Sequence, residues 1–207
     1  MKAAVLHQYD ETLSSAAFVH YEDVPDPKIE SPTDVIVRIG GAGVCRTDLH
    51  VVEGIWRNTV EIKLPYIMGH ENAGWVEAMG SAVTGVKIGD AVICHPLVTS
   101  GHCLACRRGD DMHAEESRFP GINADGGYAE YLRTGQRSLI KLPKTLAPKD
   151  VAPFTDAGLT AYRDQKSLAP PAAGRVRGGD RRRRSGPYRH PGAGSTLCSR
   201  DHHRRPV

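Results

Sequence analysis

The sequence lacks any apolar run long enough to cross a membrane, and its beginning does not resemble a secretion signal. The first residues, "MKAAVLHQYDE", turn polar within seven positions, whereas a signal peptide needs a longer apolar stretch. Internal repeats are also absent. We therefore expect a cytoplasmic protein that has no membrane partner.

Cysteine is scarce, with five in 207 residues: Cys45, Cys94, Cys103, Cys106 and Cys198. In a chain without a secretion signal, so few cysteines favour metal binding or plain thiols over a disulfide framework. Hydrophobic residues make up 40% of the chain and charged residues 25%. This composition is sufficient for one sizeable core and part of a second.

Residues 172–207 contain no lysine and very few acidic residues. Ten arginines and two aspartates give this segment a charge of +8, which leaves −5 for residues 1–171 of a chain that is +3 overall. A mildly acidic body argues against a whole domain built to hold nucleic acid. The stretch "GGDRRRRSGPYRH", residues 178–190, is typical of a solvated tail or of an arm that neutralises phosphates.

The body of the chain alternates short β-branched runs with turn residues, which predicts a mostly antiparallel barrel or sandwich. The expected strands lie within residues 2–7, 17–24, 34–44, 72–80, 87–95, 126–134 and 138–143. Two stretches have helical character, residues 45–54 and residues 148–165, and Asp156 falls in the body of the second. The fold class is therefore mainly β with short helices.

Chemically active side chains gather in two short motifs, "GAGVCRTDLH" and "GHENAG". Cys45 follows a glycine-rich strand end and opens an expected helix, where the helix dipole favours a thiolate. His70 and Glu71 follow another strand end. A thiolate and an imidazole suit zinc, and a catalytic zinc site needs three protein ligands and an open position. The local motifs do not supply the third ligand.

Four motifs together resemble the zinc-containing alcohol dehydrogenases of the medium-chain dehydrogenase/reductase superfamily: "GVCRTDLH", "GHENAGWVEAMGSAV", "GDAVICHP" and "DAGLTAY". The resemblance covers residues 1 to about 165. It implies a GroES-like catalytic domain that leads into a Rossmann domain. It also implies zinc, NAD or NADP with NAD favoured, a small alcohol or carbonyl substrate, and homo-oligomers in intact relatives.

The resemblance also assigns roles to individual residues. Three of them would be ligands of the catalytic zinc: Cys45, His70 and Asp156, the last at a position where many relatives have cysteine. Glu71 would lie beside the metal and exchange with its water. Thr47 would hydrogen-bond the alcohol oxygen, and His50 would pass its proton to solvent near neutral pH.

Each of these residues, taken alone, also fits a plain structural role. Cys45 fits a small buried apolar residue, and His70 fits a satisfied core or surface histidine. Asp156 alone fits a helix residue or cap. Thr47 at a helix start and His50 on a surface need no function.

A second metal signal is incomplete. Many relatives carry a lobe with the spacing C-x2-C-x2-C-x7-C, which forms a closed structural zinc site. Here that register falls on Ser100, Cys103, Cys106 and Ala114. His102 or His113 could substitute for a missing thiolate. We expect an empty or weak site, with Cys103 and Cys106 left as a pair on a mobile lobe.

The residues from about Arg175 onward follow neither a strand nor a helix pattern, although the family pattern would bring a strand and a G-x-G-x-x-G turn. Shifted by one base, the codons of residues 180–191 permit Ile-Gly-Val-Gly-Gly-Leu-Gly-His-Ile-Gly-Ile-Gln. This contains the dinucleotide-binding fingerprint. We therefore interpret the tail as a frameshift product that is disordered by composition.

These arguments divide the chain into residues 1–165, a GroES-like zinc-binding catalytic domain, and residues 166–207, the start of a missing Rossmann domain with a basic tail. The expected function is that of a zinc-dependent alcohol dehydrogenase by descent, inactive as encoded because the cofactor fold is missing. The alternative is a non-catalytic zinc-binding β-domain whose basic tail binds nucleic acid or acidic partners.

Overall fold

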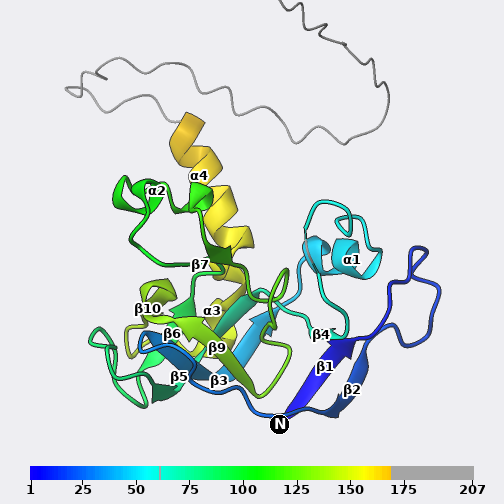
Figure 1. Cartoon of the computed structure of the whole chain (residues 1–207), viewed down its shortest axis with the longest axis horizontal. Helices are drawn as coiled ribbons and strands as arrows, with labels where there is room; N and C mark the ends of the chain where they lie inside the picture. Colours follow the sequence, from blue (N-terminus) through cyan, green and yellow to red (C-terminus); the bar gives the residue numbers. More distant parts are fainter. Residues whose placement is uncertain (61, 169–207) are drawn as a thin grey trace, which may run out of the picture. The chain divides into compact units, whose positions relative to one another are not determined.

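The computed structural model describes residues 1–60 and 62–168, and these form a mainly antiparallel β domain with short helices (Figure 1). The described residues belong to one compact unit. The prediction of a mainly β fold with short helices is thus confirmed. The basic tail expected from about Arg175, and its interpretation as a frameshift product, lie outside the described residues. Within residues 1–60 and 62–168, no helix is long and apolar enough to cross a membrane.

Two larger sheets and one small one make up the β structure, and every pairing between named strands is antiparallel. The five-stranded sheet has the order β10-β6-β5-β3-β9, with β3 (Asp34–Gly43), β5 (Glu71–Met79), β6 (Ala91–Cys94), β9 (Tyr131–Gly135) and β10 (Leu139–Lys141). The three-stranded sheet has the order β2-β1-β4, with β1 (Lys2–Leu6), β2 (His20–Asp23) and β4 (Tyr66–Ile67). A small sheet pairs β7 (Val98–Thr99) with β8 (Ser117–Arg118).

The main core follows from strand alternation, because successive side chains of a strand point to opposite faces. Val35 and Val37 of β3 are both fully buried, and they pack with Val76 of β5, Val92 of β6 and Leu132 of β9. A second cluster lies under α1 (Arg46–Val52) and combines these residues: Leu6, Val51, Val52, Tyr66, Met68 and Ile122. It fixes α1 beside β1 and β4.

The helical stretch after β10 is interrupted rather than continuous, which corrects one expectation. It consists of α3 (Pro148–Val151), the 3-10 helix η3 (Ala152–Thr155) and α4 (Ala157–Leu168). Pro153 has no backbone N–H to donate, and its ring disfavours a continuous α-helix. Asp156 therefore lies at the break between η3 and α4, with φ −127° and ψ −65°, and not in a helix body.

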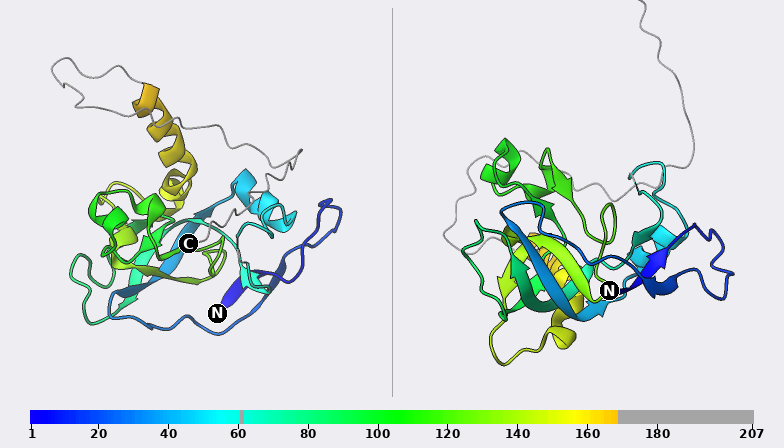
Figure 2. Two further views of the ribbon diagram at one scale, coloured as in Figure 1. Left: turned by 45° about the horizontal axis from the view of Figure 1, so that its top comes forward. Right: turned by 60° about the horizontal axis from the view of Figure 1, so that its bottom comes forward.

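Close packing of α3 on the large sheet places this break. α3 contacts both β3 and β5, and Gly41 permits the approach because a Cβ there would collide with the backbone of Lys149. The left view of Figure 2 shows α4 projecting from the domain next to the segment that contains α2 (Leu104–Arg107), and residues of both segments line one cavity. The loop from β7 to β8, residues 98–118, carries α2 and the 3-10 helix η1 (Asp111–His113); we call it the lobe. A third 3-10 helix, η2 (Gln136–Ser138), joins β9 to β10.

Candidate metal centre

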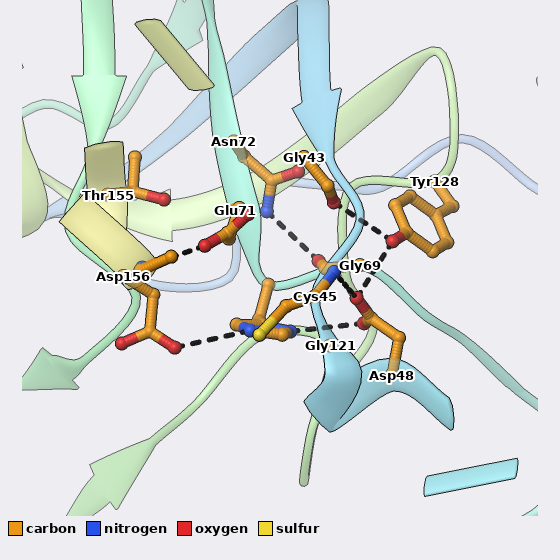
Figure 3. A network of polar contacts seen from close by, with 12 residues as sticks. Gly43, Cys45, Asp48, Gly69, Glu71, Asn72, Gly121, Tyr128, Thr155 and Asp156 are labelled. Carbon is orange, nitrogen blue, oxygen red and sulfur yellow. Dashed lines mark hydrogen bonds and ion pairs between the residues drawn. The ribbon is translucent and has the colours of Figure 1, made fainter. Parts of the chain in front are cut away.

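Four side chains with ligand-type atoms converge where three chain segments meet (Figure 3). Cys45 immediately precedes α1, His70 and Glu71 stand at the start of β5, and Asp156 lies at the break before α4. One ligand atom from each of the four lies within 4.8 Å of the others. His70 and Glu71 are buried, whereas Cys45 and Asp156 are partly exposed. The structure thus brings together the three residues predicted as zinc ligands and the predicted neighbour of the metal.

The ring of His70 is oriented by a buried carboxylate. Its Nδ1 lies 3.1 Å from Oδ1 of Asp48, and both side chains are almost completely inaccessible to solvent. A neutral imidazole that donates from Nδ1 keeps its lone pair on Nε2, which faces the other ligand atoms. Metal-binding histidines usually have their second nitrogen bonded in this way. Asp48 therefore selects the tautomer that can bind a metal.

Asp48 is the centre of this network, and sequence reasoning did not single it out. Its Oδ2 accepts a hydrogen bond from the backbone N–H of Cys45 at 2.9 Å and one from the hydroxyl of Tyr128 at 2.9 Å. The reciprocal bonds between Cys45 and Asp48 form a capping box at the start of α1. The spacing of a capping box, residues i and i+3, was a usable sequence signal.

Tyr128 reaches Asp48 by crossing directly over Gly69. Gly69 has a φ of +95°, and a Cβ at this position would collide with the Tyr128 ring. Such a backbone conformation is readily accessible only to glycine. The Tyr128 hydroxyl also lies 2.9 Å from the carbonyl oxygen of Gly43 at the end of β3. This contact ties the strand that leads to Cys45 to the segment that precedes β9, which itself packs over Gly69.

Glu71 is buried and connects β5 to the start of α4. Its Oε1 accepts a hydrogen bond from the backbone N–H of Ala157 at 2.8 Å. Because Ala157 directly follows Asp156, this bond helps to place the Asp156 carboxylate. The predicted exchange of Glu71 with a metal-bound water stays a prediction.

Two carboxylates determine the charge of His70. Burial by itself lowers the pKa of His70, but Asp156 and Asp48 outweigh this effect and raise the pKa to about 10. In turn, His70 lowers the pKa of Asp156. Without a metal, both carboxylates thus favour the protonated form of the ring.

A zinc ion fits these residues. Nε2 of His70 lies 3.3 Å from Oδ2 of Asp156, yet it is buried and has no hydrogen-bond partner of good geometry among the described residues. The ion pair with Asp156 requires a proton on Nε2, and a cation held by the thiolate, the imidazole and the carboxylate would take the place of that proton. Sulfur, nitrogen and oxygen donors are the ligands that zinc selects.

The two residues of the predicted proton relay lie on α1, outside the group of ligand atoms. Thr47 is half-buried in the first turn of the helix. His50 is in the last turn, where its Nε2 accepts a hydrogen bond from Nε of Arg46 at 3.1 Å. Its ring also packs edge-on against Trp56, with 6.1 Å between the ring centroids. The relay role of both residues stays a prediction.

The lobe does not hold a complete set of ligands for a second metal. The Sγ atoms of Cys103 and Cys106 are 3.3 Å apart, but Ser100 and Ala114 supply no thiolate at the other two positions. His113 pairs instead with Asp110 at 2.8 Å. Within residues 1–60 and 62–168, the group around Cys45 is the only one of three or more ligand-type residues that is arranged for a metal.

A cavity of about 650 Å³ lies between the lobe and α4. Asp156, Phe119 and Leu159 contribute to its wall, together with Asp111 of the lobe and His95. The partly exposed side of the ligand group therefore faces a space large enough for a small organic molecule.

Comparison with known proteins identifies relatives of this domain. Residues 31–144 match the "Alcohol dehydrogenase GroES-like domain" family. An alcohol dehydrogenase of Geobacillus stearothermophilus is 41% identical over 167 residues, which cover 80% of this chain and 47% of that protein. An NAD-dependent alcohol dehydrogenase of Sulfurisphaera tokodaii is 37% identical over 147 residues, 69% of this chain and 42% of that protein.

A solved alcohol dehydrogenase structure also resembles this domain. The alcohol dehydrogenase of the hyperthermophilic archaeon Aeropyrum pernix superimposes with a TM-score of 0.75 at 52% sequence identity, covering 82% of this chain and 48% of that one. The chain thus spans about half the length of the relatives that it matches.

Proposed function

Because the chain belongs to the zinc-type alcohol dehydrogenases of the medium-chain dehydrogenase/reductase superfamily, as their GroES-like domain, we propose that it binds a catalytic zinc ion and a small alcohol or carbonyl compound. The zinc ligands are Cys45, His70 and Asp156. The observation that carries the proposal is that their ligand atoms, including the buried Nε2 of His70, converge within 4.8 Å of one another.

Three protein ligands would leave one coordination position for the substrate oxygen. When bound, zinc supplies a Lewis acid that polarises a carbonyl or lowers the pKa of a hydroxyl. The cavity beside Asp156 gives a small substrate access to this position. Glu71 holds the start of α4, and with it Asp156, at a fixed distance from β5.

Asp48 and Tyr128 keep the ligands in place. Asp48 holds the proton on Nδ1 of His70 and fixes the backbone at Cys45 through a second hydrogen bond. Tyr128 donates a hydrogen bond to the same carboxylate. In the proposed reaction, Thr47 hydrogen-bonds the alcohol oxygen of the substrate and His50 passes the alcohol proton to solvent.

The hydride acceptor in this proposal is a nicotinamide cofactor. Relatives include NAD-dependent alcohol dehydrogenases and an NADP(+) D-arabinose 1-dehydrogenase, so both coenzymes belong in an assay. Turnover is measured by the absorbance of the reduced nicotinamide. Turnover that survives Cys45→Ser and His70→Ala would contradict the role given to the metal.

Metal binding itself gives a test that does not depend on the coenzyme. The full chain is loaded with cobalt(II) in place of zinc, and its thiolate charge-transfer and d–d bands are followed while a primary alcohol or an aldehyde is added. We expect about one metal per chain, a charge-transfer band that disappears in Cys45→Ser, and d–d bands that shift with the added compound.

A matched control is Cys106→Ser, which removes a thiol of the lobe and leaves the ligand group intact. It should keep both the band and the shift. A second tightly held zinc that survives Cys45→Ala would contradict the assignment of a single site. A cobalt spectrum that does not respond to any alcohol or aldehyde would contradict an open coordination position.

A further inference from the structure

The two cysteines of the lobe lie in contact with each other. Cys103 precedes α2 and Cys106 lies within it, and their Sγ atoms are 3.3 Å apart. Both are free thiols. Two sulfur atoms at this separation need to approach by only about 1.3 Å to reach the length of a disulfide bond.

The two thiols differ in a way that suits thiol–disulfide exchange. Cys103 is partly exposed and accepts a hydrogen bond from the backbone N–H of Cys106 at 3.5 Å. This contact lowers the pKa of Cys103, whereas burial raises the pKa of Cys106. An accessible thiol that readily ionises can attack an incoming disulfide, and the buried partner can then resolve the intermediate.

Metal binding does not account for the pair. The two positions at which zinc lobes of this family carry further thiolates are Ser100 and Ala114, and His113 is paired with Asp110. Two thiolates alone do not complete the tetrahedral site that zinc requires. A close pair without further ligands is instead free to be oxidised.

We propose that Cys103 and Cys106 form a reversible intramolecular disulfide by exchange with a low-molecular-weight disulfide of the glutathione class. The site is separate from the Cys45 centre, and the proposal does not depend on the catalytic function.

The exchange balances in two steps. The thiolate of Cys103 attacks one sulfur of the small disulfide, which forms a mixed disulfide and releases one thiolate. Cys106 then loses its proton and attacks Sγ of Cys103, which releases the second small thiolate. The two cysteines are oxidised by two electrons, the small disulfide is reduced to two thiols, and the two cysteine protons go to these thiols.

Cys106 of the pair interacts with a residue that lines the large cavity. Cys106 interacts with the side chains of Thr99 and Asp111. Asp111 lines the cavity and is held by Thr99 at 2.7 Å and by Arg137 at 2.9 Å. Oxidation of the pair would therefore change the surroundings of a residue that lines the same cavity as Asp156.

The test uses the full chain, reduced and then equilibrated with mixtures of oxidised and reduced glutathione. Exchange is stopped with acid, free thiols are alkylated, and the protein is digested with a protease that cleaves after leucine. Leu104 lies between the two cysteines, so an internal disulfide yields two fragments joined through sulfur. We expect this linked product in mass spectrometry, and we expect dithiothreitol to separate it.

Single variants assign the two roles. Cys106→Ser should stop at a glutathione adduct on Cys103. Cys103→Ser should react at least about tenfold more slowly, because the remaining thiol is buried and less ionised. Cys94 serves as an internal control, since burial raises its pKa to about 12 and it should remain a free thiol.

Three outcomes would overturn the proposal. One is a disulfide that joins other cysteines or two chains. Another is a Cys103–Cys106 pair that stays reduced in oxidised glutathione while dithiothreitol in the same buffer is oxidised. The third is protection of both thiols by a zinc ion, seen as rapid oxidation only after a chelator removes a second equivalent of zinc.

Discussion

Asp48→Asn should weaken zinc binding without unfolding the domain. The wild-type carboxylate accepts three hydrogen bonds, from Nδ1 of His70, from the backbone of Cys45 and from the hydroxyl of Tyr128. An amide has one acceptor atom and one donor group. With its oxygen toward Cys45 and Tyr128, the new amide would present N–H to His70 and favour the tautomer whose proton occupies Nε2. With its oxygen toward His70, the amide would instead turn its NH2 group toward the backbone N–H of Cys45, so that two donors would face each other.

The size of this effect follows from either arrangement. A mispaired buried polar group costs about 1–3 kcal/mol, and the loss of an outer partner of a metal-binding histidine weakens metal affinity about 10- to 100-fold. We therefore expect the zinc dissociation constant to rise by about 10- to 100-fold, which corresponds to about 1.4–2.7 kcal/mol. Competition with a chromophoric zinc chelator measures this change directly.

Tyr128→Phe is the matched control, because it removes one of the three donors and leaves the carboxylate to orient His70. Its loss of zinc affinity should be smaller than that of Asp48→Asn. Far-ultraviolet circular dichroism of the metal-free proteins checks that both variants are folded. A folded Asp48→Asn variant that binds zinc as tightly as the wild type would refute the idea that Asp48 selects the tautomer.

Two further predictions concern stability. Leu6→Ala should lower the free energy of unfolding by about 2–5 kcal/mol, because Leu6 is fully buried in the cluster under α1. The control Val44→Ala, at a side chain that is 78% exposed, should change the free energy of unfolding by no more than about 0.5 kcal/mol. Equal losses of stability for the two variants in urea denaturation would contradict this prediction. A hydrogen bond from Thr99, and to a smaller extent one from Arg137, lowers the pKa of Asp111 below 3.8. The stabilising contribution of these bonds is therefore present above pH 3.8 and is lost as the pH falls through the lowered pKa that Asp111 has in the folded state. Asp111→Asn should therefore unfold more easily than the wild type at neutral pH and equally at strongly acidic pH, whereas a pH-independent difference would exclude this titration.

The sequence pattern predicted the main strands, and the resemblance to the zinc-containing alcohol dehydrogenases implied that the four ligand-type residues converge. Alternation over β1 and β9 reflects burial of one face, and that pattern is local. By contrast, β4, β7 and β8 have two residues each, which is too short for any periodicity. They form because the surrounding loops bring the backbones together.

Two features of the site required the tertiary structure. The break at Asp156 follows from Pro153 and from the packing of α3 on β3, and only the first of these is visible locally. The role of Asp48 depends on Tyr128, which lies far away in the sequence but within hydrogen-bond distance in the fold. A capping-box spacing shows that an aspartate can close a helix start, but it does not show that the other carboxylate oxygen will meet a histidine.

The position of Asp156 at the end of the domain has a consequence for the order of assembly during synthesis. Cys45 and His70 leave the ribosome early, and most of the described chain is made before the carboxylate appears. A nascent chain that ends before Asp156 has only part of the proposed ligand set, so tight zinc binding would have to wait until the sheet is complete and α3 can dock on it. In the proposed zinc-bound form, the metal would join an early-made part of the domain to its last-made part and make the finished fold harder to open.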